Sequence, residues 1–263
     1  MAVIAGIDIG TNTLRLLVAE LENTQSLREI CSAKETTRLG EGFSTKKAFL
    51  PAAVERSVAA LKQFKEILKN YSVDNLIVVG TSAVREAENR DLFLNEVKRQ
   101  TGFDVQVISG EEEALCTFLG VNLVIKNQTE PMLVIDIGGG STEFIGAEGD
   151  APNFLLSTEL GVVHLTEKYL KSDPPTPEEL KNLRLAIDKV IKPIGYHFPP
   201  KGLFVGTAGS ITTLAAIDQK MTAYDPQKVN RYPLSRAAIE RIYKELSLMP
   251  LEQRRKTLGL EKG

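Results

Sequence analysis

The sequence predicts an α/β protein made of two related halves. Strand patterns alternate with helix patterns along the whole chain of 263 residues. A segment near the N-terminus, residues 6–20, recurs at residues 134–148 without a gap, at an offset of 128 (134 minus 6). At roughly 150 residues per domain, this length suits two modest domains. We therefore expect two α/β domains of similar fold.

The repeat is the most informative pattern in the chain. Each copy has an apolar strand, a turn rich in Gly, Ser, Thr and Asn, and a second apolar strand, which predicts a hairpin. The polar segment 126–131 is a candidate hinge, so the predicted domains are 1–125 and 126–263. The identical positions pair Ile7, Asp8, Ile9, Gly10, Ala19 and Glu20 with Ile135, Asp136, Ile137, Gly138, Ala147 and Glu148.

Helices and strands alternate between and after the hairpins. Residues 51–70 place apolar side chains on one helical face and begin with Pro51, which favours a first helical turn. Short apolar runs at 76–79 and 105–108 predict strands on either side of a helix near 90–100, and a further helix begins at Gly110. The second half repeats this order, with a helix at 177–191, a strand at 202–205 and a helix at 210–217.

Composition excludes several classes of protein. The net charge is −2, which argues against a general nucleic-acid binder. No apolar run approaches the roughly 18 residues of a membrane span, and the first residues lack a basic leader, so we expect a cytoplasmic protein without a membrane partner. Cys31 and Cys116 are expected to be reduced thiols rather than zinc ligands. Residues 201–263 carry 11 basic and 6 acidic residues, so any long polyanion is expected to bind there, and a solvated basic face is the alternative.

The second glycine turn has the chemistry of a phosphate site. Gly138, Gly139, Gly140 and Ser141 allow backbone N–H groups to approach an anion closely. Asp136 and Glu143 flank them, and these carboxylates would repel a phosphate unless a cation such as Mg²⁺, or Mn²⁺, lay between. The alternative is a tight glycine hairpin capped by acids.

The first turn repeats this pattern with one difference in charge. Thr11, Asn12 and Thr13 follow Gly10, and Arg15 occupies the position that Glu143 holds in the second copy. If the hairpins face each other across a cleft, one side offers a cation for phosphate oxygens and the other a carboxylate for a metal ion. Arg15 as a solvated strand residue is the alternative.

The wider set of motifs resembles one protein family. The hairpins resemble the phosphate loops of the actin-like ATPase superfamily, and the full set resembles its exopolyphosphatase and guanosine pentaphosphate phosphohydrolase (Ppx/GppA) branch. The resemblance implies two actin-like, ribonuclease H-like domains with mixed sheets and an active site in the cleft between them. The matching segments, in the family's order, are 6–16, 81–89, 109–114, 136–143, 158–163 and 206–210.

The resemblance also assigns roles. It implies hydrolysis of a terminal phosphoanhydride, with Glu113 as the general base that activates water. Arg85 follows a strand and a polar turn, so its guanidinium is expected to bind phosphate in the cleft, or else to pair with Glu86 or Glu88. Gly206 and Gly209 precede a helix, where N–H groups bind anions.

The chain departs from the family pattern at two places. His164 stands where many relatives carry Arg, and we expect it to be a packed residue rather than a catalyst. The second domain is expected to lack the family's final C-terminal segment. The expected substrate is inorganic polyphosphate or guanosine pentaphosphate, and a homodimer is conceivable. The alternatives are an actin-like ATP-dependent kinase or ATPase, which needs an adenosine pocket in the second domain, and a sensor that binds without turnover.

Overall fold

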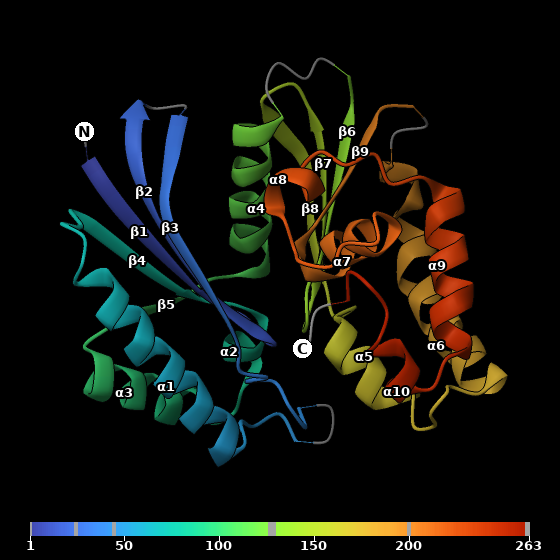
Figure 1. Ribbon diagram of the computed structural model, residues 1–263, viewed down its shortest axis with the longest axis horizontal. Coiled ribbons are helices and arrows are strands. Elements are labelled where there is room, and N and C mark those ends of the chain that lie inside the picture. The colour runs from blue at the N-terminus through green and yellow to red at the C-terminus, as the bar shows by residue number, and fades with distance from the viewer. Residues whose placement is uncertain (1, 24–25, 44–45, 126–129, 199–200, 261–263) are drawn as a thin grey trace.

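Two mixed β-sheets with helices packed around them form the molecule. The computed structural model describes residues 2–23, 26–43, 46–125, 130–198 and 201–260. Figure 1 shows the two sheets side by side, with helix α4 (Gly110–Val124) between them. The predicted α/β class is therefore confirmed. Most of the predicted hinge, residues 126–129, lies outside the described residues.

The first sheet has five strands in the order β3-β2-β1-β4-β5. Strands β1 to β3 are antiparallel neighbours, whereas β4 and β5 run parallel to β1 and therefore need helical crossovers. The bounds are β1 Ala2–Ile9, β2 Thr13–Asn23, β3 Ser26–Thr36, α1 Pro51–Leu68, β4 Asn75–Gly80, α2 Ser82–Glu86, α3 Arg90–Thr101 and β5 Val105–Val107.

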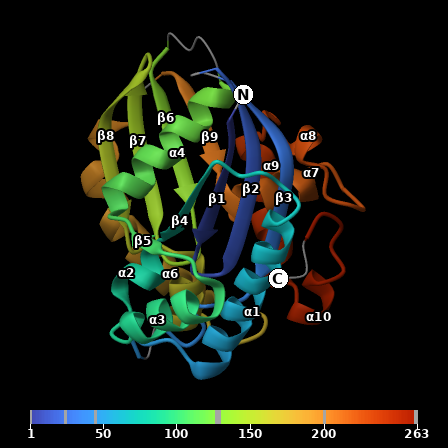
Figure 2. The same ribbon diagram turned by 90° about the vertical axis from the view of Figure 1, so that its left-hand side faces the viewer.

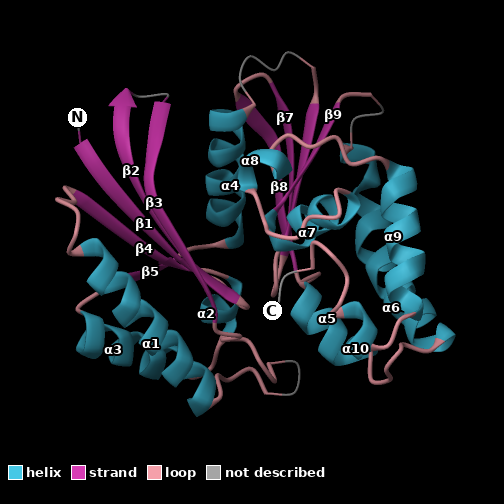
Figure 3. Cartoon of the chain, in the orientation of Figure 1, coloured by secondary structure: helices cyan, strands magenta, loops and turns pink. Residues whose placement is uncertain are grey.

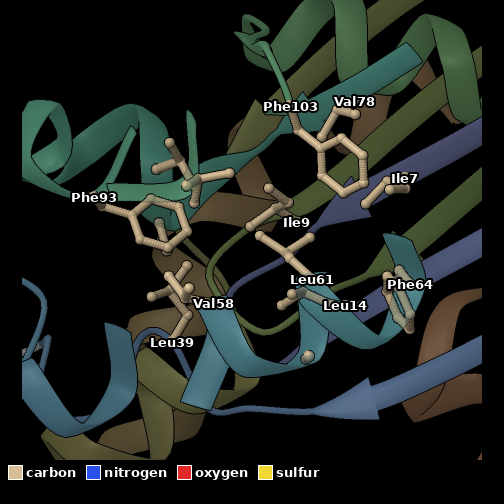
Figure 4. Close-up of a cluster of buried hydrophobic side chains, with 14 of the residues drawn as sticks. Ile7, Ile9, Leu14, Leu39, Val58, Leu61, Phe64, Val78, Phe93 and Phe103 are labelled. Atoms are coloured by element: carbon tan, nitrogen blue, oxygen red, sulfur yellow. The ribbon is translucent and has the colours of Figure 1, made fainter. Parts of the chain in front are cut away.

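The core of this half lies between the sheet and helix α1. Ile7 and Ile9 of β1 point toward Leu61 of α1, and none of the three is more than 1% exposed (Figure 4). Because side chains alternate along a strand, Asp8 lies on the opposite face of the sheet. Packing of the apolar face thus presents Asp8 to the other half of the molecule.

The second sheet repeats this topology with four strands in the order β8-β7-β6-β9. Strands β6 to β8 are antiparallel neighbours, and β9 is parallel to β6, as β4 is to β1. The bounds are β6 Met132–Ile137, β7 Thr142–Glu148, β8 Ala151–Thr158, α5 Val162–Tyr169, α6 Pro177–Ile191, the 3₁₀ helix η1 Lys192–His197, β9 Leu203–Thr207, α7 Ala208–Asp218, α8 Pro226–Val229, α9 Arg236–Leu248 and α10 Leu251–Arg254.

Helix α4 belongs by packing to the second sheet. Ala114 and Phe118 are fully buried against β6 and β7, where they meet Met132 and Val134. Figure 2 shows α4 lying across β6, β7 and β8. The chain therefore crosses between the halves before α4, near Ser109, although the boundary at residue 125 itself stays a prediction. This crossing carries the residues around Glu113 to the junction of the two halves.

The predicted hairpins and the predicted helices and strands between them are present, but the sequence patterns missed β3 and β8. Both are edge strands, and all of their residues are exposed or only partly buried, so their apolar alternation is weak. Among the described residues, the structure contains no helix with the length and hydrophobicity needed to cross a bilayer.

Candidate active site

The two glycine turns meet where the sheets approach each other. Each turn is closed by the same hydrogen bond, from Gly10 N–H to the Thr13 carbonyl at 3.2 Å and from Gly138 N–H to the Ser141 carbonyl at 3.0 Å. A Cβ atom added to Gly140 would lie 2.5 Å from the Thr11 hydroxyl oxygen. A side chain at this position would displace the Thr11 and Ser82 hydroxyl groups, so glycine favours the close packing of the two turns.

Helix α5 holds the second turn in place. The N–H groups of Val162 and Val163 donate to the carbonyls of Gly138 and Gly139, at 3.0 and 2.9 Å. A Cβ atom on Gly161 would lie 2.1 Å from the Gly140 carbonyl carbon, so this position accepts only glycine without movement of the backbone. The orientation of the second turn thus depends on the start of α5.

Loop residues that precede α1 contact α5 and tie the halves together at the same end (Figure 3). Gly42 N–H donates to Glu167 Oε1 at 2.8 Å. The Phe43 ring stacks on His164, with centroids 5.4 Å apart and planes 7° from parallel. The buried Nε2 of His164 has no hydrogen-bond partner among the described residues. His164 is therefore a packing residue at the junction, as expected from the sequence.

Asp8 and Asp136 end the central strands of the two sheets. Burial raises the pKa of Asp8 to about 6, and the nearby Asp136 charge adds to this, whereas Arg15 opposes it. Asp8 Oδ1 is buried and has no hydrogen-bond partner among the described residues. Burial also raises the pKa of Asp136, although its Oδ2 accepts a hydrogen bond from Thr117 at 3.0 Å. The two halves thus bring together a pair of buried carboxyl groups whose pKa values are raised.

Arg15 and Glu143 occupy equivalent places beside these acids. Register pairs Asp8 with Arg15 across β1 and β2, and Asp136 with Glu143 across β6 and β7. Glu143 is 1% exposed, and burial raises its pKa although Ser157 donates to its Oε1 at 2.6 Å. Arg15 is exposed, and its charge lowers the pKa of both aspartates, so it faces the site.

Glu113 lies in the first turn of α4, where it meets Arg85. Arg85 Nη1 is 3.2 Å from Glu113 Oε2 and donates to the Ile108 carbonyl at 2.9 Å, whereas no ion pair joins Arg85 to Glu86 or Glu88. Burial, reinforced by the charge of Glu143, raises the pKa of Glu113 to about 8 against the opposing effect of Arg85. A carboxyl group with such a pKa is mostly protonated at neutral pH, and its ionised form is a stronger proton acceptor than an ordinary carboxylate.

The two glutamates that precede Glu113 lie outside the site. Glu112 accepts from Ser109 N–H, and its own N–H donates to Ser109 Oγ, so the two residues form a capping box. Glu111 is exposed. Only Glu113 of the three points into the site, as the helical periodicity predicted.

Two cavities border the site. One, of about 310 Å³, lies between the first glycine turn and α5, with Thr11, Asn12 and Val162 in its wall. The other, of about 1380 Å³, extends from Asp136 and Gly206 between α4, β9 and α7, and two tyrosines, Tyr224 and Tyr232, line its far part. We call this second cavity the β9 groove.

The predicted residues near β9 lie beside this groove. Gly206 is the second-last residue of β9 and leaves no room for a side chain, because a Cβ atom there would be 2.6 Å from Ile211. Gly209 lies in the first turn of α7, where an added Cβ atom would meet no other atom within 4 Å. Ser210 Oγ donates to the Ile137 carbonyl, which joins α7 to the second glycine turn.

The oxygen donors at the site suit a hard divalent cation. No group of three or more His, Cys, Asp or Glu side chains within the described ranges is close enough to form a preassembled metal cage. Mg²⁺, however, commonly takes only one or two carboxylates together with water and substrate phosphate. The unpartnered Asp8 oxygen beside Asp136, with Glu143 next to it, fits such an ion.

Comparison with known proteins establishes the family. A sequence profile of the Ppx/GppA phosphatase family matches residues 17–263. The chain belongs to the Ppx/GppA phosphatase family. Among curated relatives, exopolyphosphatase 2 of Mycobacterium tuberculosis is 33% identical over 261 residues, which cover 95% of this chain and 82% of the relative. The fold of mixed sheets flanked by helices, which the resemblance implied, is confirmed, and the division into two domains stays a prediction.

Solved structures of Ppx/GppA proteins agree. The Aquifex aeolicus member superposes with a TM-score of 0.81 at 32% identity, over 99% of this chain and 84% of that one. An exopolyphosphatase from Cytophaga hutchinsonii gives a TM-score of 0.90 at 29% identity, over 99% and 84% of the two chains.

Reasoning from the sequence left three polar residues of this Ppx/GppA site out of the candidate set. Asp8 is visible in the repeat, because it aligns with Asp136 and the two acids belong to equivalent strands. Thr117 and Ser157, by contrast, reach their carboxylates from α4 and β8, and no local pattern marks them.

Proposed function

We propose that this Ppx/GppA protein releases terminal orthophosphate from inorganic polyphosphate. The observation that carries the proposal is the contact of Glu113 with Arg85 beside two facing glycine turns. Exopolyphosphatase activity in the names of its relatives supports the same reaction. Phosphoryl transfer depends mainly on positioning and charge neutralisation, and this site offers groups for both.

The predicted site residues, together with Asp8, would each have a part in the reaction. Thr11, Asn12 and Thr13 of the first turn, together with residues 138–141, would position phosphoryl oxygens through N–H and hydroxyl groups. Arg15 and Arg85 would bind the charge that develops on these oxygens. Mg²⁺ or Mn²⁺ held by Asp8, Asp136 and Glu143 would supply positive charge against the phosphate.

Glu113 would act as the base. Its carboxylate would take a proton from a water molecule while the water oxygen forms a bond to the terminal phosphorus. The bridging P–O bond would break, and the shortened chain would leave with the electron pair. The raised pKa of Glu113 strengthens the carboxylate as a proton acceptor once it is ionised.

Glu113→Gln tests this assignment because it keeps the shape of the side chain and removes the base. We expect kcat for phosphate release from polyphosphate to fall by about 100-fold or more. Glu111→Gln, an exposed neighbour in the same helical turn, is the matched control and should retain wild-type kcat. Wild-type turnover by Glu113→Gln would show that Glu113 is not the base. Tight binding of polyphosphate without phosphate release by the wild-type protein would indicate a sensor instead of an enzyme.

The β9 groove favours guanosine pentaphosphate as a second candidate substrate. Its volume of about 1380 Å³ exceeds that of many small-molecule pockets, and Tyr224 and Tyr232 offer aromatic surface for a base. A substrate panel of short polyphosphate, long polyphosphate, guanosine pentaphosphate and ATP distinguishes these classes. Faster release from guanosine pentaphosphate than from polyphosphate would make the nucleotide the main substrate.

A further inference from the structure

Three polar side chains lie in one row across the second sheet. Asp136 on β6 pairs in register with Glu143 on β7, and Glu143 pairs with Ser157 on β8. Directly opposed residues present their side chains on the same face of a sheet, so these three side chains share one face. We call them the polar row.

The next row on this face is apolar. Val134 and Ile145 pair in register there, and Leu155 extends the row on β8. All three side chains pack in the cluster that contains Ala114 and Phe118 of α4. Helix α4 therefore covers the face of the sheet that carries the polar row.

Ser157 contacts both the Glu143 carboxylate and the start of α4. Its hydroxyl donates to Glu143 Oε1 at 2.6 Å. A Cβ atom added to Gly110, the first residue of α4, would lie 2.5 Å from Ser157 Cβ and 2.8 Å from Ser157 Oγ, so the helix backbone packs directly against this side chain. Gly110 and Glu113 belong to the same helical turn. One serine on an edge strand thus supports a carboxylate of the site and the helical turn that carries the proposed base.

The Glu143 carboxylate depends on its hydrogen bonds because it is almost completely buried. Its exposed fraction is 1%, so bulk water cannot replace a lost donor. Ser141 also forms a hydrogen bond with Glu143, but Ser141 belongs to the glycine turn that would bind phosphate. Ser157, by contrast, lies on a strand whose register holds it opposite Glu143. Its hydroxyl can therefore hold the carboxylate independently of that turn.

Asp136 is held in the same manner from α4. Thr117 donates to Asp136 Oδ2 at 3.0 Å, and Thr117 lies one helical turn after Glu113. Each carboxylate of the polar row thus accepts a hydrogen bond from a hydroxyl outside the hairpin β6–β7. Groups of this kind orient carboxylates that bind metal ions, and their loss typically weakens metal binding.

We propose that Ser157 is a positioning residue whose hydroxyl orients the Glu143 carboxylate for the divalent cation. The inference rests on the proposed function and adds a residue to its metal site. Ser157 acts through Glu143 and not on the substrate.

Titration of the substrate-free protein with Mn²⁺, read from the electron paramagnetic resonance signal of free Mn²⁺, tests this without turnover. Ser157→Ala should raise Kd for Mn²⁺ by about 10-fold, whereas Ser157→Thr keeps the hydroxyl and should stay within about 3-fold of the wild type. In phosphate-release assays, the Mg²⁺ concentration for the half-maximal rate should rise by a similar factor in Ser157→Ala, and kcat at saturating Mg²⁺ should recover. A purely structural defect would instead lower kcat at every Mg²⁺ concentration.

Thr158→Val is the matched control. Thr158 is the next residue on β8, and its hydroxyl donates to the Thr142 carbonyl at 2.9 Å. The variant therefore also removes a hydrogen bond between β8 and β7, but not one to a carboxylate. Its Kd for Mn²⁺ should stay within about 2-fold of the wild type, and urea unfolding of Ser157→Ala and Thr158→Val checks that both fold.

The proposal is overturned if the wild type does not bind Mn²⁺ or if Kd is unchanged in Ser157→Ala. Weakening of equal size in Ser157→Thr or Thr158→Val would also overturn it, because the effect would then not come from the Ser157 hydroxyl. Absence of phosphate release by a wild type that shows the expected Mn²⁺ difference would instead refute the proposed function. The role of Ser157 toward the cation would then stand.

Discussion

At the residue scale, the buried carboxyl group of Asp8 lowers the stability of the folded protein when it is charged. Folding buries its carboxyl group beside Asp136, and one of its oxygens has no hydrogen-bond partner in the part of the chain that the structure describes. The pKa rises from 3.8 to about 6, so the folded state binds this proton more tightly than the unfolded state does. Stability must therefore fall as pH rises from 4 to 6, and the loss persists at higher pH.

Asp8→Asn removes this charge, so we expect it to stabilise the protein. A shift of about 2 pKa units limits the gain to about 3 kcal/mol at pH 8, and the gain should shrink toward zero as pH falls to 4. Urea unfolding across this pH range measures it, with the exposed Asp91→Asn as a control. If the variant is less stable than wild type at pH 8, favourable interactions of the charged Asp8 carboxylate in the folded protein outweigh the cost of burying it.

At the scale of elements, the start of α5 controls the second glycine turn. A methyl group at Gly161 would collide with backbone atoms of Gly139 and Gly140, which cannot rotate away as a side chain can. We expect Gly161→Ala to lower the free energy of unfolding by about 1–3 kcal/mol and to abolish phosphate release.

Gly120→Ala is the matched substitution, since this glycine lies inside α4 and an added Cβ would meet no atom within 4 Å. Alanine should stabilise the helix by about 0.5–1 kcal/mol. Urea unfolding of both variants gives opposite signs if the contact at Gly161 is the cause. Equal changes in the free energy of unfolding would mean that the lower chain entropy of alanine in the unfolded state, rather than packing of the turn, determines the effect at Gly161.

At the scale of the whole molecule, the repeat made the two-sheet architecture and the facing turns predictable. Asp8 and Asp136 align in the sequence because equivalent strands carry them. The sequence could not show that α4 leaves the first half and packs on the second sheet, because its apolar residues suit either surface. For the same reason the sequence did not predict the contact between Glu113 and Arg85, which are 28 residues apart.

The two halves differ in the size of their cores, and this difference predicts uneven stability. Twenty buried residues form one cluster in the first half, whereas the clusters described in the second half contain six and four. Helices α5 and α6 bury no residue fully. Fewer buried apolar contacts lower the free energy of local opening.

Backbone amides of the second half should therefore exchange faster than those of the first half. We expect amides of β9, α7 and α9 to exchange through openings about 1–3 kcal/mol less costly than those of β1 and α1. Measurement by mass spectrometry of peptides from each element resolves the two groups. Equal protection of β9 and β1 would show that the smaller clusters open only with the larger core. If the two halves differ in this way, a ligand that contacts both glycine turns should slow amide exchange most in the second half. The free energy of local opening is lower in that half, so binding has more opening to suppress there.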